Sequence, residues 1–368
     1  MTEQRIRPLI GVTMGDAAGV GPEVVVKALN LPEIHADCRP LVIGDLHRFQ
    51  VTVEGIGLPL KVQPVRSPAE GRYEHGTIDV LQATDVDLRG IAYGQVDPRC
   101  GAAAVHCVKL ATEMALRGEL DAICTAPLNK DAMNQAGYHY PGHTEMLGEF
   151  TNTPNYSMML STGKLRVLHV STHVSLKEAI RRVKTPRVLE VIRLAHHAAR
   201  EYLGIENPHV AVAGLNPHAG ENGLFGHEDV EQIAPAIEQA KADGIHCTGP
   251  WAGDTLFARA YQGQFDICVA QFHDQGHVAV KMLGFEGGVN TTIGLPIIRT
   301  SADHGTAFGR AGQWRASPNS QIEAVQLAAH VARQRLARPV PSPGAGCRVP
   351  ACRDRVPPGR GGGGAGRG

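Results

Sequence analysis

The sequence predicts an α/β fold with a mostly parallel sheet. Apolar runs of strand length alternate with amphipathic helical stretches, and glycine or proline separates them. The length of 368 residues is ample for two α/β domains or one large α/β unit. Right-handed crossovers then place all strand carboxyl ends on one rim of the sheet, where ligands bind in open α/β folds. We therefore expect the chemistry to lie at strand ends.

The N-terminal segment is predicted to be a strand, a glycine loop and a helix. LIGVTM (9–14) is the strand, GDAAGVG (15–21) is the loop, and Pro22 suits the first turn of a helix that ends near Leu29. The loop has the glycine order GxxxGxG, which differs from the dinucleotide fingerprint GxGxxG. It is compatible with an anion site at the helix N-terminus and equally with a plain tight turn.

The same alternation continues along the chain. Strands are predicted at 41–44, 120–127, 166–173, 209–218 and 265–274, and helices at 101–118, 186–203, 229–244 and 320–336. Thr185 is the expected N-cap of the helix that follows it, and Gly204 its terminator. Residues 45–98 are predicted to be less regular and to carry no chemistry.

Charge and composition exclude several function classes. The chain has 36 basic and 36 acidic residues, but its last 31 residues hold six Arg and one Asp. This leaves 30 basic and 35 acidic residues in 1–337, a balance of −5, so we expect no nucleic-acid binding. No apolar run approaches the ~18 residues of a membrane span, and the N-terminus does not resemble a signal peptide. The eight scattered Cys are typical of reduced thiols, so we expect a cytoplasmic protein without membrane association.

The tail 338–368 differs from the rest in composition. It is rich in Gly, Pro and Arg and has almost no large hydrophobic residues, which predicts disorder. A basic tail that binds RNA or a membrane is the alternative.

Three predicted strands end in histidine: His173, His218 and His273. If these strands are neighbours, or a dimer brings them together, three imidazoles meet at the ligand-binding rim. Three neutral imidazoles with open positions describe a catalytic divalent-metal site. The alternative is that each histidine caps a strand end by bonding the backbone. Imidazole ligands favour the softer transition metals.

Seven longer sequence motifs carry a resemblance to a known family. They are MGDAAGVGPE, TAPLNK, YPGHTEML, HVSTH, GLNPHAGENGLFGHED, QFHDQGH and GVNTTIGLPIIRTSADHGTAFG. In these motifs the chain resembles the 4-hydroxythreonine-4-phosphate dehydrogenase family over residues 8–337. The resemblance implies a fold similar to isocitrate and isopropylmalate dehydrogenases, with two subdomains, an interdomain cleft and a homodimer that shares its sites. The subdomains would be 1–135 plus 304–337 and 136–303, the second contributing metal, substrate and dimer contacts.

The resemblance also implies site residues. The metal ligands fall on His173, His218 and His273, with His273 as the candidate for a contribution from the second subunit. Substrate binding falls on a further set, which is His143, Thr144, Lys281, Asn290 and Arg299. Lys281 is either an acid–base group or a phosphate clamp, and Asp254 and Asp274 are lesser candidates for catalytic orienting groups or routine caps. The 4-phosphorylated acid would be oxidised by NAD, bound near Gly305, Thr306 and Ala307, with one Zn, Mg, Mn or Co ion.

Within the family, TAPLNK, NPHAGENGLFG and His277 resemble the branch that oxidises 4-phosphothreonate or 4-phosphoerythronate. The expected reaction is oxidation at C3 followed by decarboxylation to dihydroxyacetone phosphate. The alternatives are the pyridoxal-pathway enzyme acting on 4-phosphohydroxythreonine, a cis-dihydrodiol carboxylate dehydrogenase, and a non-catalytic sugar-phosphate-binding protein. The chain departs from the family at Ala17 and at Gly309 and Arg310, and the latter pair bears on cofactor affinity.

Overall fold

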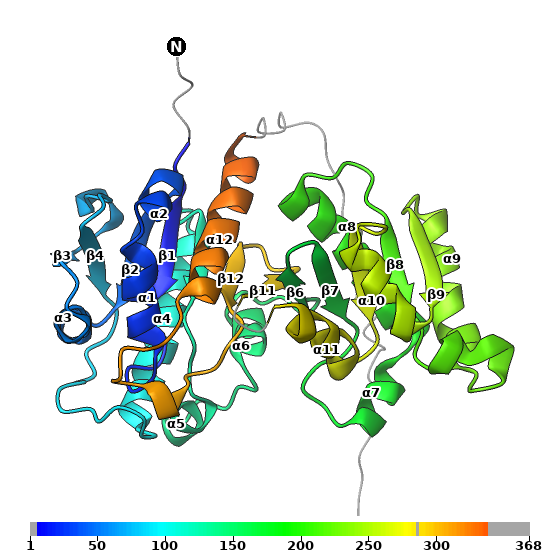
Figure 1. The fold of residues 1–368 in the computed structure, drawn as a ribbon, viewed down its shortest axis with the longest axis horizontal. Helices are drawn as coiled ribbons and strands as arrows, with labels where there is room; N and C mark the ends of the chain where they lie inside the picture. Colours follow the sequence, from blue (N-terminus) through cyan, green and yellow to red (C-terminus); the bar gives the residue numbers. More distant parts are fainter. Residues whose placement is uncertain (1–5, 285–286, 338–368) are drawn as a thin grey trace, which may run out of the picture. The chain divides into compact units, whose positions relative to one another are not determined.

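The computed structural model describes residues 6–284 and 287–337. Within them, twelve strands form one sheet in the order β3-β4-β2-β1-β5-β12-β11-β6-β7-β10-β8-β9 (Figure 1). The strands are β1 Leu9–Thr13, β2 Arg39–Gly44, β3 Lys61–Val65, β4 Thr77–Gln82, β5 Ala122–Thr125, β6 Ser157–Thr162, β7 Leu165–His169, β8 Val210–Ala213, β9 Cys247–Trp251, β10 Ile267–Ala270, β11 Val289–Ile293 and β12 Arg299–Ala302. The mostly parallel α/β sheet expected from the sequence is confirmed.

The helices flank this sheet. They are α1 Gly21–Leu29, α2 Pro32–Asp37, α3 Leu46–Ile56, α4 Pro98–Leu116, α5 Lys130–Gln135, α6 His143–Phe150, α7 Leu176–Arg182, α8 Thr185–Leu203, α9 Ala234–Ala242, α10 Gly253–Tyr261, α11 His273–Leu283 and α12 Asn319–Ala337. Shorter helical turns are η1 Pro68–Glu70, η2 Pro217–Gly223, η3 Asp229–Ile233 and η4 Phe308–Arg310. None of the helices in the described ranges is long and apolar enough to cross a membrane.

The sheet consists of two parallel blocks that run in opposite directions. β3, β4, β2, β1, β5 and β12 form one block, and β7, β10, β8 and β9 form the other. Between them, β11 pairs antiparallel with both β12 and β6, and β6 pairs antiparallel with β7. These three reversals mean that the strand carboxyl ends share a rim only within each block. The expectation of a single rim for all strands is therefore wrong.

The segment 45–98 is more regular than the sequence suggested. It contains α3, which Asp45 caps by accepting a hydrogen bond from the Arg48 amide, and the edge strands β3 and β4. β3 is largely half-buried or exposed, so it lacks the apolar run by which a buried strand is recognised. The helix carries β-branched Val51, Thr52 and Val53, which have only modest helix propensity.

Residues up to Ala337 group into one compact unit. Its main apolar core runs through both blocks of the sheet, from Ile10 and Val12 of β1 to Val210 of β8. The subdomain boundaries 1–135 plus 304–337 and 136–303 stay a prediction. The predicted disordered tail 338–368 lies outside the described residues.

Candidate active site

A polar cavity of about 260 Å3 lies where β5, β11 and β12 meet α6. At its wall Arg299 of β12 is 1 % exposed. Its guanidinium donates to Thr125 Oγ1 at 2.7 Å, to Thr292 Oγ1 at 3.0 Å and to Asn290 Oδ1 at 3.3 Å. These three acceptors are all neutral. Burial lowers the Arg299 pKa to about 10, so the side chain is still cationic at neutral pH. A buried cation held by neutral groups is suited to a bound anion.

Four of the five predicted substrate residues line this cavity: His143, Thr144, Asn290 and Arg299. His143 begins α6, and its Nε2 is buried without a partner. Burial, then the nearby Arg299 charge, lowers the His143 pKa well below its usual value, so the imidazole is neutral. The fifth residue, Lys281, does not line the cavity. Its ammonium lies 2.5 Å from the carboxylate of Asp303, which does.

The structure brings together two of the three predicted metal histidines. The rings of His173 and His273 lie 5.8 Å apart, centroid to centroid. Each Nδ1 faces a carboxylate: His173 lies 3.3 Å from Glu145, and His273 lies 2.7 Å from Asp274. A carboxylate on one ring nitrogen leaves the other nitrogen as a metal ligand, so this pair fits a divalent ion. Burial is the largest single effect and raises the Glu145 pKa, but the hydrogen bond with His173, a backbone hydrogen bond and the electrostatic effects of His173 and Lys130 together lower it.

His218 lies elsewhere on the chain, in the exposed turn η2, where its ring is 6.0 Å from Phe225. Over residues 6–284 and 287–337, no three His, Cys, Asp or Glu side chains are grouped to hold a metal ion. The three-histidine set therefore stays a prediction. None of the three histidines lies within a strand: His173 and His218 follow β7 and β8 at a distance, and His273 begins α11.

The two lesser catalytic candidates occupy different environments. Asp274 contacts His273 as an orienting group would. Asp254 is exposed in the first turn of α10 and is not among the residues lining the cavity.

A neighbouring cavity of about 300 Å3 adjoins the predicted cofactor stretch. Gly305 and Ala307 line it, together with Val20 and Arg310. Thr306 is not in the lining, but its carbonyl accepts a hydrogen bond from the Val20 amide at 3.0 Å. The glycine loop 15–21 is thus a buried turn packed on the cofactor stretch, and Val20, at its helix junction, faces the cavity. Asp303 and His304 line both cavities, so the two spaces are adjacent.

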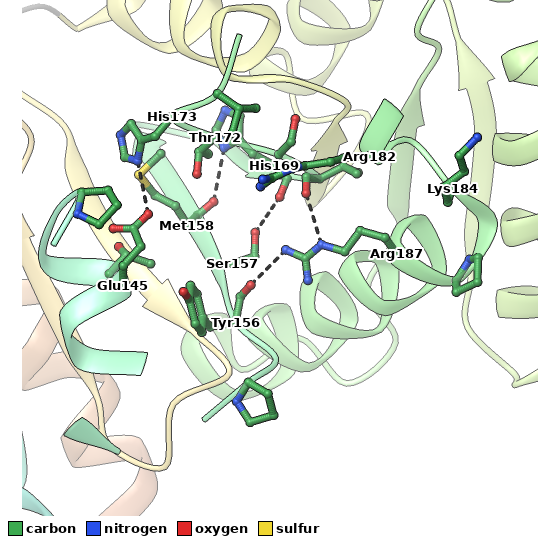
Figure 2. A pocket seen from close by; sticks show the side chains of 17 residues that line it. Glu145, Tyr156, Ser157, Met158, His169, Thr172, His173, Arg182, Lys184 and Arg187 are labelled. Carbon is green, nitrogen blue, oxygen red and sulfur yellow. Dashed lines mark hydrogen bonds and ion pairs between the residues drawn. The ribbon is translucent and has the colours of Figure 1, made fainter. Parts of the chain in front are cut away.

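A larger cavity of about 590 Å3 borders the substrate cavity on the side of His173 (Figure 2). The two cavities share Thr144, Glu145, Met158 and His173. In Figure 2 the Glu145 carboxylate reaches the His173 ring between α6 and the end of β7.

Sequence reasoning assigned no role to several residues of the site. Thr125 and Thr292 hold Arg299, Glu145 orients His173, and Lys130 lines the substrate cavity. His277 lines it too and stacks on His273 with ring centroids 3.6 Å apart. Thr125 and Lys130 belong to the TAPLNK motif and Glu145 to YPGHTEML, so the motifs contained them without indicating what each one contacts.

Comparison with known proteins identifies the family of the chain. The model of the pyridoxal phosphate biosynthetic protein PdxA family matches residues 36–328. The chain belongs to the PdxA family. A D-threonate 4-phosphate dehydrogenase of Cupriavidus necator is 49 % identical over 89 % of this chain and 98 % of its own length.

Solved structures of other dehydrogenases share the fold. A 4-hydroxythreonine-4-phosphate dehydrogenase from Klebsiella pneumoniae superimposes with a TM-score of 0.81 at 43 % identity, over 88 % of this chain and 99 % of that one. A terephthalate 1,2-cis-dihydrodiol dehydrogenase from Burkholderia xenovorans is more distant, with a TM-score of 0.62 at 28 % identity over 88 % and 98 %. The predicted family and enzyme class are confirmed: the chain is a dehydrogenase of the PdxA family, for which NAD(P) is implied as cofactor. The family implies a phosphorylated four-carbon acid as substrate.

Proposed function

We propose that the chain oxidises 4-phosphothreonate or 4-phosphoerythronate at C3 and decarboxylates the product to dihydroxyacetone phosphate. The observation that carries this proposal is Arg299, a buried cation held only by neutral groups at the wall of a small polar cavity. A small acid offers little apolar surface, so its affinity must come from charge-assisted hydrogen bonds of ~1.5–3 kcal/mol each. The name of the Cupriavidus relative supports a threonate phosphate.

In the proposed reaction the C3 hydroxyl proton passes to a base, and hydride leaves C3. The C1–C2 bond then breaks and CO2 departs. The electron pair of that bond stays on C2 and forms an enolate with the C3 carbonyl, and the enolate is protonated at C2. Gly305, Thr306 and Ala307 would hold NAD, which would accept the hydride. His173, His273 and a third imidazole would hold a divalent metal, which would supply Lewis acidity.

The residues of this chain position the substrate. The buried Arg299 charge attracts the phosphate, and the one guanidinium N–H that Thr125, Thr292 and Asn290 leave free donates to a phosphate oxygen. Asn290 donates beside it. Lys281, released from Asp303, is an acid–base group or a second phosphate clamp. Neutral His143 is suited to a hydrogen bond with the substrate because its buried Nε2 has no partner in the chain.

The third imidazole is proposed to come from a second copy of the chain. His218 is exposed, and its turn carries Leu224, 71 % exposed, and Phe225, 46 % exposed. On α11, which carries His273, Val278 is 60 % and Met282 is 81 % exposed. Large exposed apolar side chains on the elements that carry metal histidines favour a homodimer with shared sites. On this geometry the partner supplies His218, whereas the sequence had suggested His273.

The test is a substrate panel. Purified protein is assayed for NADH formation with 4-phosphothreonate, 4-phosphoerythronate, 4-phosphohydroxythreonine and unphosphorylated threonate, each with Zn, Mg, Mn or Co. NADP replaces NAD in a parallel set. We expect turnover with a 4-phospho sugar acid and dihydroxyacetone phosphate as the product. Equal use of unphosphorylated threonate would overturn the proposed phosphate site and bring the dihydrodiol alternative forward.

One second candidate has support of its own. The Klebsiella structure is named for 4-hydroxythreonine-4-phosphate, the amino analogue of the same acid. A higher kcat/KM for 4-phosphohydroxythreonine in the panel would decide for it.

A further inference from the structure

The turn that carries His218 has an unusual backbone. Five consecutive residues, His218 to Asn222, are left-handed, with φ between 39° and 77°. Only Gly220 among them is a glycine. A β carbon crowds the following carbonyl in this region, so each of the other four residues opposes the conformation. The rest of the loop must therefore hold the turn in place.

One buried carboxylate anchors the residues that lead into this turn. Asp229, at the start of η3, is fully buried. Its Oδ1 accepts a hydrogen bond from the Leu215 amide at 2.8 Å. Its Oδ2 accepts from the Asn216 amide at 3.2 Å and from Asn216 Nδ2 at 2.9 Å. All three donors lie two or three residues before His218.

The loop is also packed tightly around this carboxylate. A β carbon added at Gly214 would lie 2.7 Å from Asp229 Oδ1, and one added at Gly220 would lie 3.1 Å from Oδ2. The carboxylate therefore contacts both the entry to the left-handed turn and its middle. His218 itself remains exposed at the start of the turn.

We infer that Asp229 is a positioning residue: it holds the left-handed turn and thereby aims the exposed His218 imidazole at the metal site of a second copy of the chain. The inference rests on the proposed function, in which His218 is a metal ligand. Asp229 acts only through the turn, since it is buried and bonded to backbone and amide groups.

The decisive variant is Asp229→Asn. An amide of the same size keeps the packing but presents an NH2 group to donors that need an acceptor. We expect metal-free D229N to bind Co2+ at least about tenfold more weakly than wild type, as happens when an orienting partner of a ligand is lost. Saturating Co2+ should restore most of the turnover, because His218 is still present. Co2+ affinity is measured by titration of the full-length protein, well below its melting temperature.

Two further variants serve as a control for the loss of a carboxylate and as an alternative to D229N. Glu231→Gln removes an exposed carboxylate from the same turn of helix and should leave Co2+ affinity unchanged. Asn216→Ala removes the Nδ2 group, which donates to Asp229 and also to Glu228 Oε2, but it keeps both backbone donors to Asp229. It should therefore weaken Co2+ binding less than D229N and remain informative if D229N does not fold.

Two results overturn the inference. The first is a folded D229N that binds Co2+ as wild type does, or, where D229N does not fold, an N216A that does so. The second is a loss of affinity that saturating Co2+ does not rescue, because a purely structural role predicts that. His218→Ala separates this from the proposed function: if H218A binds Co2+ normally, the metal assignment itself fails, and the role of Asp229 fails with it.

Discussion

The Arg299 cavity and the His218 turn are built in opposite ways. The cation of the cavity is buried and bonded to three neutral side chains of the same chain. The turn presents its histidine to solvent, and within the described residues that histidine is not grouped with His173 and His273 as metal ligands. A buried cavity can be pre-formed by one polypeptide, whereas in the proposed site a second copy of the chain completes the set of metal ligands. Phosphate recognition and metal binding should therefore respond differently to mutation and to subunit mixing.

The largest expected effect is the loss of turnover when a metal histidine is removed, and it distinguishes the metal site from the Arg299 cavity. His173→Ala or His218→Ala should each lower kcat/KM by about a thousandfold, the ~4 kcal/mol that a Lewis-acid metal contributes. In purified heterodimers of H173A and H218A subunits, one of the two shared sites is intact, so about half of the wild-type turnover should return.

The matched control for this mixture is a heterodimer of H173A and H273A. Both of these histidines come from the same chain in the proposed site, so each site lacks one ligand and no turnover should return. Recovery in this control, or none in the first mixture, would contradict a site in which the partner supplies His218.

The next effect concerns the cavity alone. Arg299→Lys replaces a planar guanidinium, which has several N–H donors, by a compact ammonium group. The kcat/KM for the phosphorylated acid should therefore fall at least about tenfold, or ~1.4 kcal/mol. The residual activity with unphosphorylated threonate should change much less, and Co2+ affinity should not change. Equal losses for both acids would show that Arg299 acts on something other than the phosphate.

An effect on stability rather than turnover is expected at Asp16, in the glycine loop 15–21 beside the cofactor cavity. Burial raises the pKa of Asp16 from 3.8 to about 6. The folded chain therefore holds this proton to higher pH than the unfolded chain does, and the free energy of unfolding falls as pH rises from about 4 to 6. The decrease is up to about 3 kcal/mol. Asp16→Asn should flatten this pH dependence in urea unfolding, whereas exposed Asp85→Asn should not. An unchanged slope in D16N would contradict the prediction.

The smallest effect is expected from removing the tail. A chain that ends at Ala337 should keep its melting temperature and turnover, because residues 338–368 offer few groups for a core. A fall of several degrees would show that the tail stabilises the rest of the protein.

Sequence reasoning was most successful where burial leaves a periodic pattern. The strands 9–14, 120–127 and 265–274 and the helix 186–203 all occur, because each places apolar residues toward one core. It failed for β3 and α3, whose patterns are weak, and for β6 and β11, whose antiparallel pairing reverses the second half of the sheet. Strand direction depends on long-range pairing, which local residue patterns do not encode.

By itself the sequence determined the α/β class and the family, because these follow from periodicity and from ordered motifs. The residues that carry the chemistry stay a prediction. The tertiary structure decided the rest. In it, Arg299 bonds Thr125 of another strand, and the His173 ring lies near that of His273. His218 lies on a turn next to residues that Asp229 bonds. Contacts between residues distant along the chain arise only when strand order and loop conformation are set by packing of the whole chain, so no local pattern could have shown them.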